Sequence, residues 1–229
     1  MDKALNKISG TVRSWMFWPA RFLNFISGGR IKPDHVTLVS LLGHLSVVWA
    51  LMQWRPLLAA LLLAFFGIMD TLDGALARLQ KTTSLRGMFF DSVSDRIKEV
   101  LVYIGVACFI SQSVYYNSSR LAGWLATTYA SWGNYGGEWL VVAVCGLSLV
   151  ISYVKAKGEM ALSSGGTHDS QLLNRVFSDG FARYEVRMTI IIIGLLSGQL
   201  FIIMHILLIL LVITVLQRII KVSKALNNV

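Results

Sequence analysis

Four aspartates lie between residues 70 and 95, in the most apolar part of the chain. Asp70 and Asp73 follow the run LLAALLLAFFGIM, and Asp91 and Asp95 precede the run VLVYIGVACFI. Charged side chains within membrane-spanning segments are costly and mark function. Residues three or four apart share a helix face. The spacing therefore predicts two pairs of carboxylates that converge across a gap between two antiparallel helices, which only a short turn, about KTTSL, connects.

Converging carboxylates repel one another, so the arrangement requires a cation. Ligand sets made only of oxygen suit Mg²⁺ or Mn²⁺ rather than zinc, and four carboxylates are enough for two ions. Gly74, Ala77 and Gly87 are small where a bulky ligand would approach the backbone, and Arg78 could hold a phosphate. The alternative is that each aspartate caps a helix or pairs with a nearby arginine. That explanation serves for one aspartate but poorly for four with this spacing.

The composition indicates that these helices cross a membrane. Of the 229 residues, 55% are hydrophobic and 14% are charged, whereas soluble domains carry about 25% charged residues. Several windows of roughly 18 to 25 residues are almost wholly apolar, which is long enough to span a bilayer. The net charge of +9 could suit nucleic acid, but in a membrane protein it more often marks cytoplasmic loops. Cys108 and Cys145 lie in apolar segments and indicate neither a disulfide framework nor a zinc site.

The predicted fold class is an all-α integral membrane protein with six transmembrane helices and an N-terminal amphipathic juxtamembrane helix. Residues 2–28 alternate apolar and basic side chains, which predicts a helix lying on the cytoplasmic face and kinked at Pro19; the alternative is an ordinary cytosolic helix packed on the loops. We expect one domain over 1–229, with the juxtamembrane helix and an entry loop in 1–33 and a six-helix catalytic bundle in 34–229. The six spans are predicted at 36–54, 57–80, 86–116, 138–160, 179–198 and 200–224.

The distribution of basic residues predicts the orientation. If the N-terminus is inside, the outer connections hold only Arg55 and Arg120, and every other lysine and arginine lies at an inner loop, an inner helix end or a terminus. Such an asymmetry places both termini in the cytoplasm. The aspartates then lie near the inner surface of the membrane.

The aspartates form part of a longer pattern, D-x-x-D-G-x-x-A-R-x8-G-x-x-x-D-x-x-x-D. At every fixed position this stretch resembles the signature of the CDP-alcohol phosphotransferase family. The resemblance extends to the six helices, the juxtamembrane helix and the cytoplasmic termini. It implies a reaction in which a hydroxyl attacks the β-phosphorus of a CDP-linked lipid and CMP leaves. It also implies a homodimer in the cell membrane, with the active site facing the cytoplasm.

The resemblance further implies roles for individual residues. Asp70, Asp73 and Asp91 would bind metal, and Asp95 would act as the base and also bind metal. Two Mg²⁺ or Mn²⁺ ions would neutralise the diphosphate and stabilise the leaving CMP. The residues implied to contact the CDP-lipid are Gly74, Ala77, Arg78, Ser84, Gly87 and the segment Asp34, His35, Val36 and Thr37, although Pro33 and Asp34 could instead simply begin a helix.

The second half of the chain indicates which alcohol would accept the phosphatidyl group. The residues expected to bind an acceptor phosphate are Lys155, Lys157, Arg183, Arg187 and Arg218, which the predicted orientation puts on the side of the aspartates. The alternative is that these cations only reflect the cytoplasmic location of their segments. That alternative suits Arg218 least, because Arg218 lies within an apolar span. SYVKAKGE resembles segments of synthases that use inositol phosphate, so we expect a phosphatidylinositol-phosphate synthase or its archaeal counterpart acting on CDP-archaeol.

Two alternatives stay open. Glycerol 3-phosphate also carries a phosphate and would make the protein a phosphatidylglycerophosphate synthase. An ion or proton transporter is the alternative from another class, since paired carboxylates within a membrane can carry ions. Transport sites are expected near the midplane of the membrane, often at broken helices, whereas these aspartates flank an inner turn. Release of CMP from a CDP-lipid distinguishes the two classes.

Overall fold

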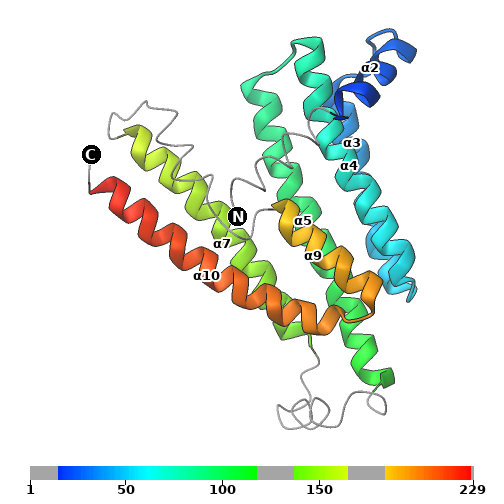
Figure 1. The fold of residues 1–229 in the computed structure, drawn as a ribbon, viewed down its shortest axis with the longest axis vertical. Coiled ribbons are helices and arrows are strands. Elements are labelled where there is room, and N and C mark those ends of the chain that lie inside the picture. The colour runs from blue at the N-terminus through cyan, green and yellow to red at the C-terminus, as the bar shows by residue number, and fades with distance from the viewer. Residues whose placement is uncertain (1–14, 118–136, 165–183, 228–229) are drawn as a thin grey trace. The chain divides into compact units, whose positions relative to one another are not determined.

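The computed structural model describes residues 15–117, 137–164 and 184–227. In these residues all regular secondary structure is helical (Figure 1). The chain divides into two compact units, residues 1–105 and 106–229, and each is described here by itself. The single domain expected over 1–229 stays a prediction.

The first unit holds α2 (Phe17–Ile26), α3 (Pro33–Met52), α4 (Pro56–Gln80) and the first two thirds of α5 (Leu85–Asn117). α3 and α4 each begin with a proline, which has no N–H to leave unpaired in the first helical turn. The short connection between them makes them antiparallel neighbours, and they pack along their lengths (Figure 1). α2 packs on α4.

α4 ends and α5 begins around a tight turn. Lys81 adopts a left-handed conformation with φ of 55°, and the Thr82 N–H donates to the Ala77 carbonyl at 3.0 Å. Such a helix ending closes the last turn and redirects the chain. The predicted short connection between the two aspartate-bearing helices is therefore confirmed.

Two glycines set how closely helices of the first unit approach one another. A β-carbon on Gly43 of α3 would collide with the ring of Phe66 on α4. A β-carbon on Gly105 of α5 would lie 2.8 Å from the Leu51 side chain and 3.2 Å from the Val48 backbone on α3. Around these contacts the core is apolar, and its members include Val47, Ala50, Leu51, Ala59, Leu63 and Val102.

The second unit holds the end of α5 together with α7 (Glu138–Ser164), α9 (Tyr184–Ser197) and α10 (Leu200–Leu226). α10 packs against α7 and α9. Gly198 has φ of 68° and makes the sharp turn between α9 and α10.

Four of the described helices are long and apolar enough to cross a membrane: α3, α4, α7 and α10. The six predicted spans thus all correspond to helices, but α5 and α9 do not meet this measure within the described residues. The first turns of α5 carry Arg86, Asp91, Asp95, Arg96, Lys98 and Glu99. The described part of α9 has only 14 residues. Large apolar side chains such as Leu61, Val142 and Ile209 are exposed on the spans, as contact with lipid would require.

The predicted N-terminal helix is described only from Trp15 onward, and residues 1–14 lie outside the described part. Pro19 falls in the first turn of α2, where proline is tolerated. Trp18, Phe22 and Phe25 are exposed, while Ala20 is buried.

Candidate active site

The first aspartate pair is held by hydroxyl groups of the neighbouring helix. The Thr37 hydroxyl donates to Asp73 Oδ2 at 2.6 Å, and the Ser40 hydroxyl donates to Asp70 Oδ1 at 2.6 Å. Thr37 and Ser40 are three residues apart, as are Asp70 and Asp73. The two hydroxyl groups on one face of α3 therefore meet the two carboxylates on one face of α4. Because the helices are antiparallel, the earlier hydroxyl meets the later aspartate. These contacts fix both carboxylates while leaving each with further lone pairs for a cation.

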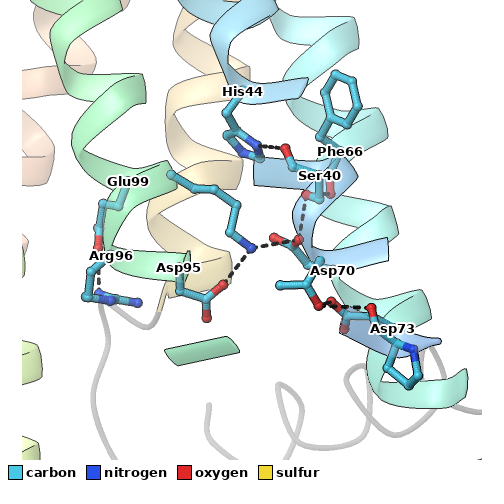
Figure 2. A network of polar contacts seen from close by, with 11 residues as sticks. Ser40, His44, Phe66, Asp70, Asp73, Asp95, Arg96 and Glu99 are labelled. Atoms are coloured by element: carbon cyan, nitrogen blue, oxygen red, sulfur yellow. Dashed lines mark hydrogen bonds and ion pairs between the residues drawn. The ribbon is translucent and has the colours of Figure 1, made fainter. Parts of the chain in front are cut away.

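A lysine connects the two aspartate-bearing helices. Lys98 Nζ lies 2.7 Å from Asp70 Oδ1 on α4 and 2.8 Å from Asp95 Oδ1 on α5, and its side chain is fully buried. Figure 2 shows Asp70 and Asp95 turned toward each other around this ammonium group. The two helices thus approach each other at Asp70 and Asp95, with a protein cation between the carboxylates.

The other two aspartates line a cleft of about 680 Å³. Asp73 comes from α4 and Asp91 from α5. Of the residues expected to contact a CDP-lipid, seven line the same cleft: Asp34, Thr37, Gly74, Ala77, Arg78, Ser84 and Gly87. Segments separated by as much as 57 positions in the chain therefore form one surface, from Asp34 to Asp91.

The small residues leave the cleft open. A β-carbon on Gly74 would meet Arg78 Nη1 at 3.6 Å, an ordinary contact. A β-carbon on Gly87 would lie 3.2 Å from the Ser84 hydroxyl, which already accepts the Gly87 N–H at 3.0 Å. The fold alone would thus tolerate a methyl group at Gly74, so a need for glycine there would come from a ligand.

Arg78 is exposed in the cleft, and its guanidinium lies 5.9 Å from the centre of the Phe17 ring on α2. Gln80 reaches back to the same segment: its amide donates to Asn24 Oδ1 and to the Ile31 carbonyl, both at 2.9 Å. α2 and the loop that follows it therefore brace the end of α4 from which Arg78 projects.

Four of the residues predicted to bind metal or CDP-lipid are not part of the cleft lining. Asp70 and Asp95 are joined through Lys98. Val36 is buried, with 4% of its surface exposed. His35 Nδ1 lies 3.4 Å from the Lys32 backbone nitrogen, so its ring closes the first turn of α3. The reading of Pro33 and Asp34 as a helix start also holds, since α3 begins at Pro33, and Asp34 lines the cleft as well.

The predicted acceptor residues lie in the second unit. Arg187 and Arg218 are buried, and Arg218 Nη1 donates to the Ile151 carbonyl on α7 at 3.1 Å. Lys155 and Lys157 are exposed; Lys155 pairs with Glu159 at 3.8 Å, and Lys157 lies over the Tyr153 ring. Arg183 falls outside the described residues.

The four aspartates fit a divalent cation by their chemistry. They offer only oxygen ligands, and Asp70 Oδ2 is buried with no hydrogen-bond partner within the described structure. However, no three His, Cys, Asp or Glu side chains among the described residues gather closely enough to hold an ion together. At Asp70 and Asp95, the Lys98 ammonium lies between the carboxylates. The two-ion site stays a prediction.

Sequence reasoning missed Lys98 and Ser40. Lys98 lies three residues after Asp95 and seven after Asp91, so it shares their helix face, and this spacing was a usable signal. Ser40 lies three residues after Thr37, but only the alignment of α3 with α4 shows that it faces Asp70.

Comparison with known proteins identifies the family. Residues 30–220 match the model of the CDP-alcohol phosphatidyltransferase family. The chain belongs to this family. The family resemblance drawn from the aspartate pattern is thereby confirmed, and with it the general class of phosphatidyl-transferring enzymes.

Two curated relatives of the family illustrate its chemistry. The archaetidylinositol phosphate synthase of Pyrococcus horikoshii is 28% identical over 86% of this chain and 86% of its own length. The phosphatidylinositol phosphate synthase of Corynebacterium glutamicum is 31% identical over 64% of this chain and 58% of its own length.

Solved structures share the fold. The crystal structure of Mycobacterium tuberculosis phosphatidylinositol phosphate synthase with CDP-DAG bound has a TM-score of 0.67 at 22% identity, over 90% of this chain and 92% of that one. The same enzyme in complex with manganese and citrate has a TM-score of 0.66 at 22% identity, over 91% of this chain and 88% of that one.

Proposed function

We propose that the protein transfers the phosphatidyl group of a CDP-linked lipid, CDP-diacylglycerol or CDP-archaeol, to a phosphorylated alcohol and releases CMP. The observation that carries this proposal is the cleft in which Asp73, Asp91 and seven of the residues expected to contact a CDP-lipid meet. Inositol phosphate is the first choice of acceptor, because the relatives named above are an archaetidylinositol phosphate synthase and a phosphatidylinositol phosphate synthase. Glycerol 3-phosphate is the second choice. A CDP-diacylglycerol–glycerol-3-phosphate 3-phosphatidyltransferase of Pectobacterium atrosepticum supports it, with 41% identity over 54 residues. This match covers 24% of this chain and 30% of that protein.

In this proposal the cleft binds the CDP moiety. Gly74 and Ala77 let the nucleotide approach the α4 backbone, and the exposed Arg78 guanidinium binds the diphosphate. Asp34, Thr37, Ser84 and Gly87 line the rest of the cleft. Thr37 and Ser40 hold Asp73 and Asp70 in place by their hydroxyl groups.

Asp95 acts as the base. It accepts the proton of the acceptor hydroxyl as the oxygen attacks the β-phosphorus, and CMP departs with the electron pair of the broken phosphoanhydride bond. Asp70, Asp73, Asp91 and Asp95 would hold two Mg²⁺ or Mn²⁺ ions, which when bound neutralise the diphosphate and the charge developing on CMP. Lys155, Lys157, Arg183, Arg187 and Arg218 bind the phosphate of the acceptor.

The setting in the cell follows from the same proposal. The protein has six transmembrane helices preceded by an amphipathic helix that lies on the membrane surface, with the exposed aromatic side chains of α2 in the headgroup layer. Both termini and the active site face the cytoplasm, and the protein is a homodimer in the cell membrane.

The test is a product assay. Purified protein receives CDP-diacylglycerol or CDP-archaeol, Mg²⁺, and one of inositol phosphate, glycerol 3-phosphate, inositol or serine. With inositol phosphate as the acceptor, we expect release of CMP and formation of a lipid that carries the inositol phosphate group. A preference for glycerol 3-phosphate would select the second acceptor, a preference for inositol or serine would overturn the phosphorylated acceptor, and no CMP with any acceptor would favour a transporter.

Metal removal gives a separate prediction. EDTA should abolish CMP release, and added Mg²⁺ or Mn²⁺ should restore it, because only hard oxygen ligands are available in the motif. Zn²⁺ at the same concentration serves as the matched control and should restore little. Full activity in EDTA would contradict the metal-dependent reaction.

A further inference from the structure

Lys98 is a cation placed between two residues of the proposed catalytic set. Its side chain is fully buried, and Nζ lies within 2.8 Å of one oxygen each of Asp70 and Asp95. A buried ammonium is costly unless it is paired, and here two carboxylates from two different helices pair with it. Asp70 and Asp95 are themselves partly accessible, with 13% and 26% of their side chains exposed.

The position of this ammonium is not explained by helix pairing alone. A structural ion pair between α4 and α5 would need one carboxylate, and α5 already carries the local pair of Arg96 with Glu99. Lys98 instead contacts the two motif aspartates that lie outside the cleft lining. A divalent ion bound to the same oxygens would have to displace the ammonium or share the carboxylates with it. Sharing is unfavourable, because two cations that contact the same carboxylates repel each other.

We propose that Lys98 is a tethered counter-ion: it holds Asp70 and Asp95 together when no divalent ion is bound, and it competes with that ion for their oxygens. The inference rests on the metal site of the proposed function and adds a residue of this chain to it. It follows that Lys98 lowers the affinity of the free enzyme for metal. A CDP-lipid diphosphate adds negative charge to the cleft, so metal binding should be favoured once that substrate is bound.

The experiment measures Mn²⁺ binding directly, by electron paramagnetic resonance of free Mn²⁺, on the full-length protein in detergent. Lys98→Met keeps most of the side-chain volume without the charge, and Lys98→Arg keeps the charge. Lys224→Met, at an exposed lysine of α10, is the matched control. We expect Lys98→Met to lower the Kd for Mn²⁺ by roughly tenfold, because the substitution removes one positive charge, which repels the ion, from beside its carboxylate ligands. Lys98→Arg and Lys224→Met should stay within about twofold of the unmodified protein.

Thermal unfolding supplies the second readout. Lys98→Met should have a lower Tm than the unmodified protein without Mn²⁺ and a larger rise in Tm when Mn²⁺ is added, because the ion takes over the role of the lost ammonium. If Lys98 had only a structural role, Lys98→Met would lower Tm equally in the absence and in the presence of Mn²⁺. An unchanged or raised Kd for Lys98→Met would overturn the proposal.

A measurement on the unmodified protein covers the case in which Lys98→Met does not fold. The ¹⁵N resonance of the Lys98 ammonium, assigned with Lys98→Arg, should shift when diamagnetic Mg²⁺ is added and stay in place when the same ionic strength is reached with NaCl. A resonance that ignores Mg²⁺ at a concentration that saturates binding would refute the competition. If the unmodified protein bound neither Mn²⁺ nor Mg²⁺, the metal-dependent function itself would fail and the Lys98 inference with it. Normal metal binding with no effect of Lys98 would remove only the inference.

Discussion

Three of the motif aspartates contact two kinds of partner, neutral hydroxyl groups and one ammonium group. Asp73 and Asp70 accept hydrogen bonds from neutral hydroxyls at 2.6 Å, and the Lys98 ammonium lies 2.7 Å from Asp70 and 2.8 Å from Asp95. A hydroxyl fixes a carboxylate without neutralising it, and an ammonium does both. If Lys98 moves, Asp70 keeps its hydroxyl partner, whereas Asp95, which we assign as the base, loses the ammonium that pairs with it.

Replacement of Asp95 by asparagine tests that assignment. Asparagine has nearly the same volume and can still accept from Lys98, but it cannot take a proton. We expect Asp95→Asn to fold and bind CDP-lipid while turnover falls by about 10²-fold or more. The measurements are CMP release at saturating substrates and CDP-lipid binding; turnover near that of the unmodified enzyme would remove Asp95 from the role of base.

Arg218 tests the acceptor site. Arg218→Ala should raise KM for the phosphorylated acceptor by roughly one to two decades, since a hydrogen bond to a charged group contributes about 1.5–3 kcal/mol. KM for the CDP-lipid should change little, because the cleft lies in the other unit.

A control is needed because Arg218 also donates to the Ile151 carbonyl. Loss of that bond would lower Tm and reduce turnover without a selective effect on one substrate. Lys224→Ala on the same helix should leave both KM values unchanged. An unaltered acceptor KM in Arg218→Ala would mean that the cations of the second unit report only a cytoplasmic location.

At the scale of elements, the alignment of α3 with α4 decides which hydroxyl meets which aspartate. Gly43 lets the Phe66 ring pack against α3, and Gly105 lets α5 approach α3 at the level of Val48 and Leu51. These contacts lie one to several turns from the aspartates, so close packing of the spans supports the geometry of the site.

Gly105→Ala tests this packing. The added methyl group would lie 3.2 Å from the backbone of Val48, which cannot rotate away, and overpacking of this kind typically costs about 1–3 kcal/mol. We expect a lower Tm in detergent. Gly67→Ala on α4 is the matched control: its β-carbon would meet nothing within 4 Å, and alanine favours the helix by up to about 1 kcal/mol. Equal Tm values for the two variants would show that the close approach is not needed.

At the scale of the whole molecule, the orientation in the membrane can be tested at the two connections flanking α4. We predict that the turn after α4 faces the cytoplasm and that the connection before it faces outward. In a variant with Cys108 and Cys145 replaced by alanine, Thr83→Cys should react with an impermeant maleimide only in inside-out vesicles, and Gln53→Cys only in right-side-out vesicles. The reversed pattern would invert the topology and place the cleft outside.

The sequence by itself determined the helices and the family. Apolar runs of membrane-spanning length, broken by prolines at positions 33 and 56 and by the turn at 81–84, located α3, α4 and α5 closely. The fixed spacing of the aspartates, glycines and Arg78 identified the motif. These are local properties, because helix periodicity alone places residues three or four apart on one face.

Only the tertiary structure decided what the aspartates touch. Periodicity gives each helix a face but says nothing of the axial alignment between two helices, which depends on side-chain packing along both. That alignment put Thr37 and Ser40 on Asp73 and Asp70, and it brought Lys98 of α5 to Asp70 of α4. In the sequence, a lysine three residues after an aspartate indicates a local ion pair. In the structure, Asp70 of α4 also lies 2.7 Å from the ammonium, so two helices share it.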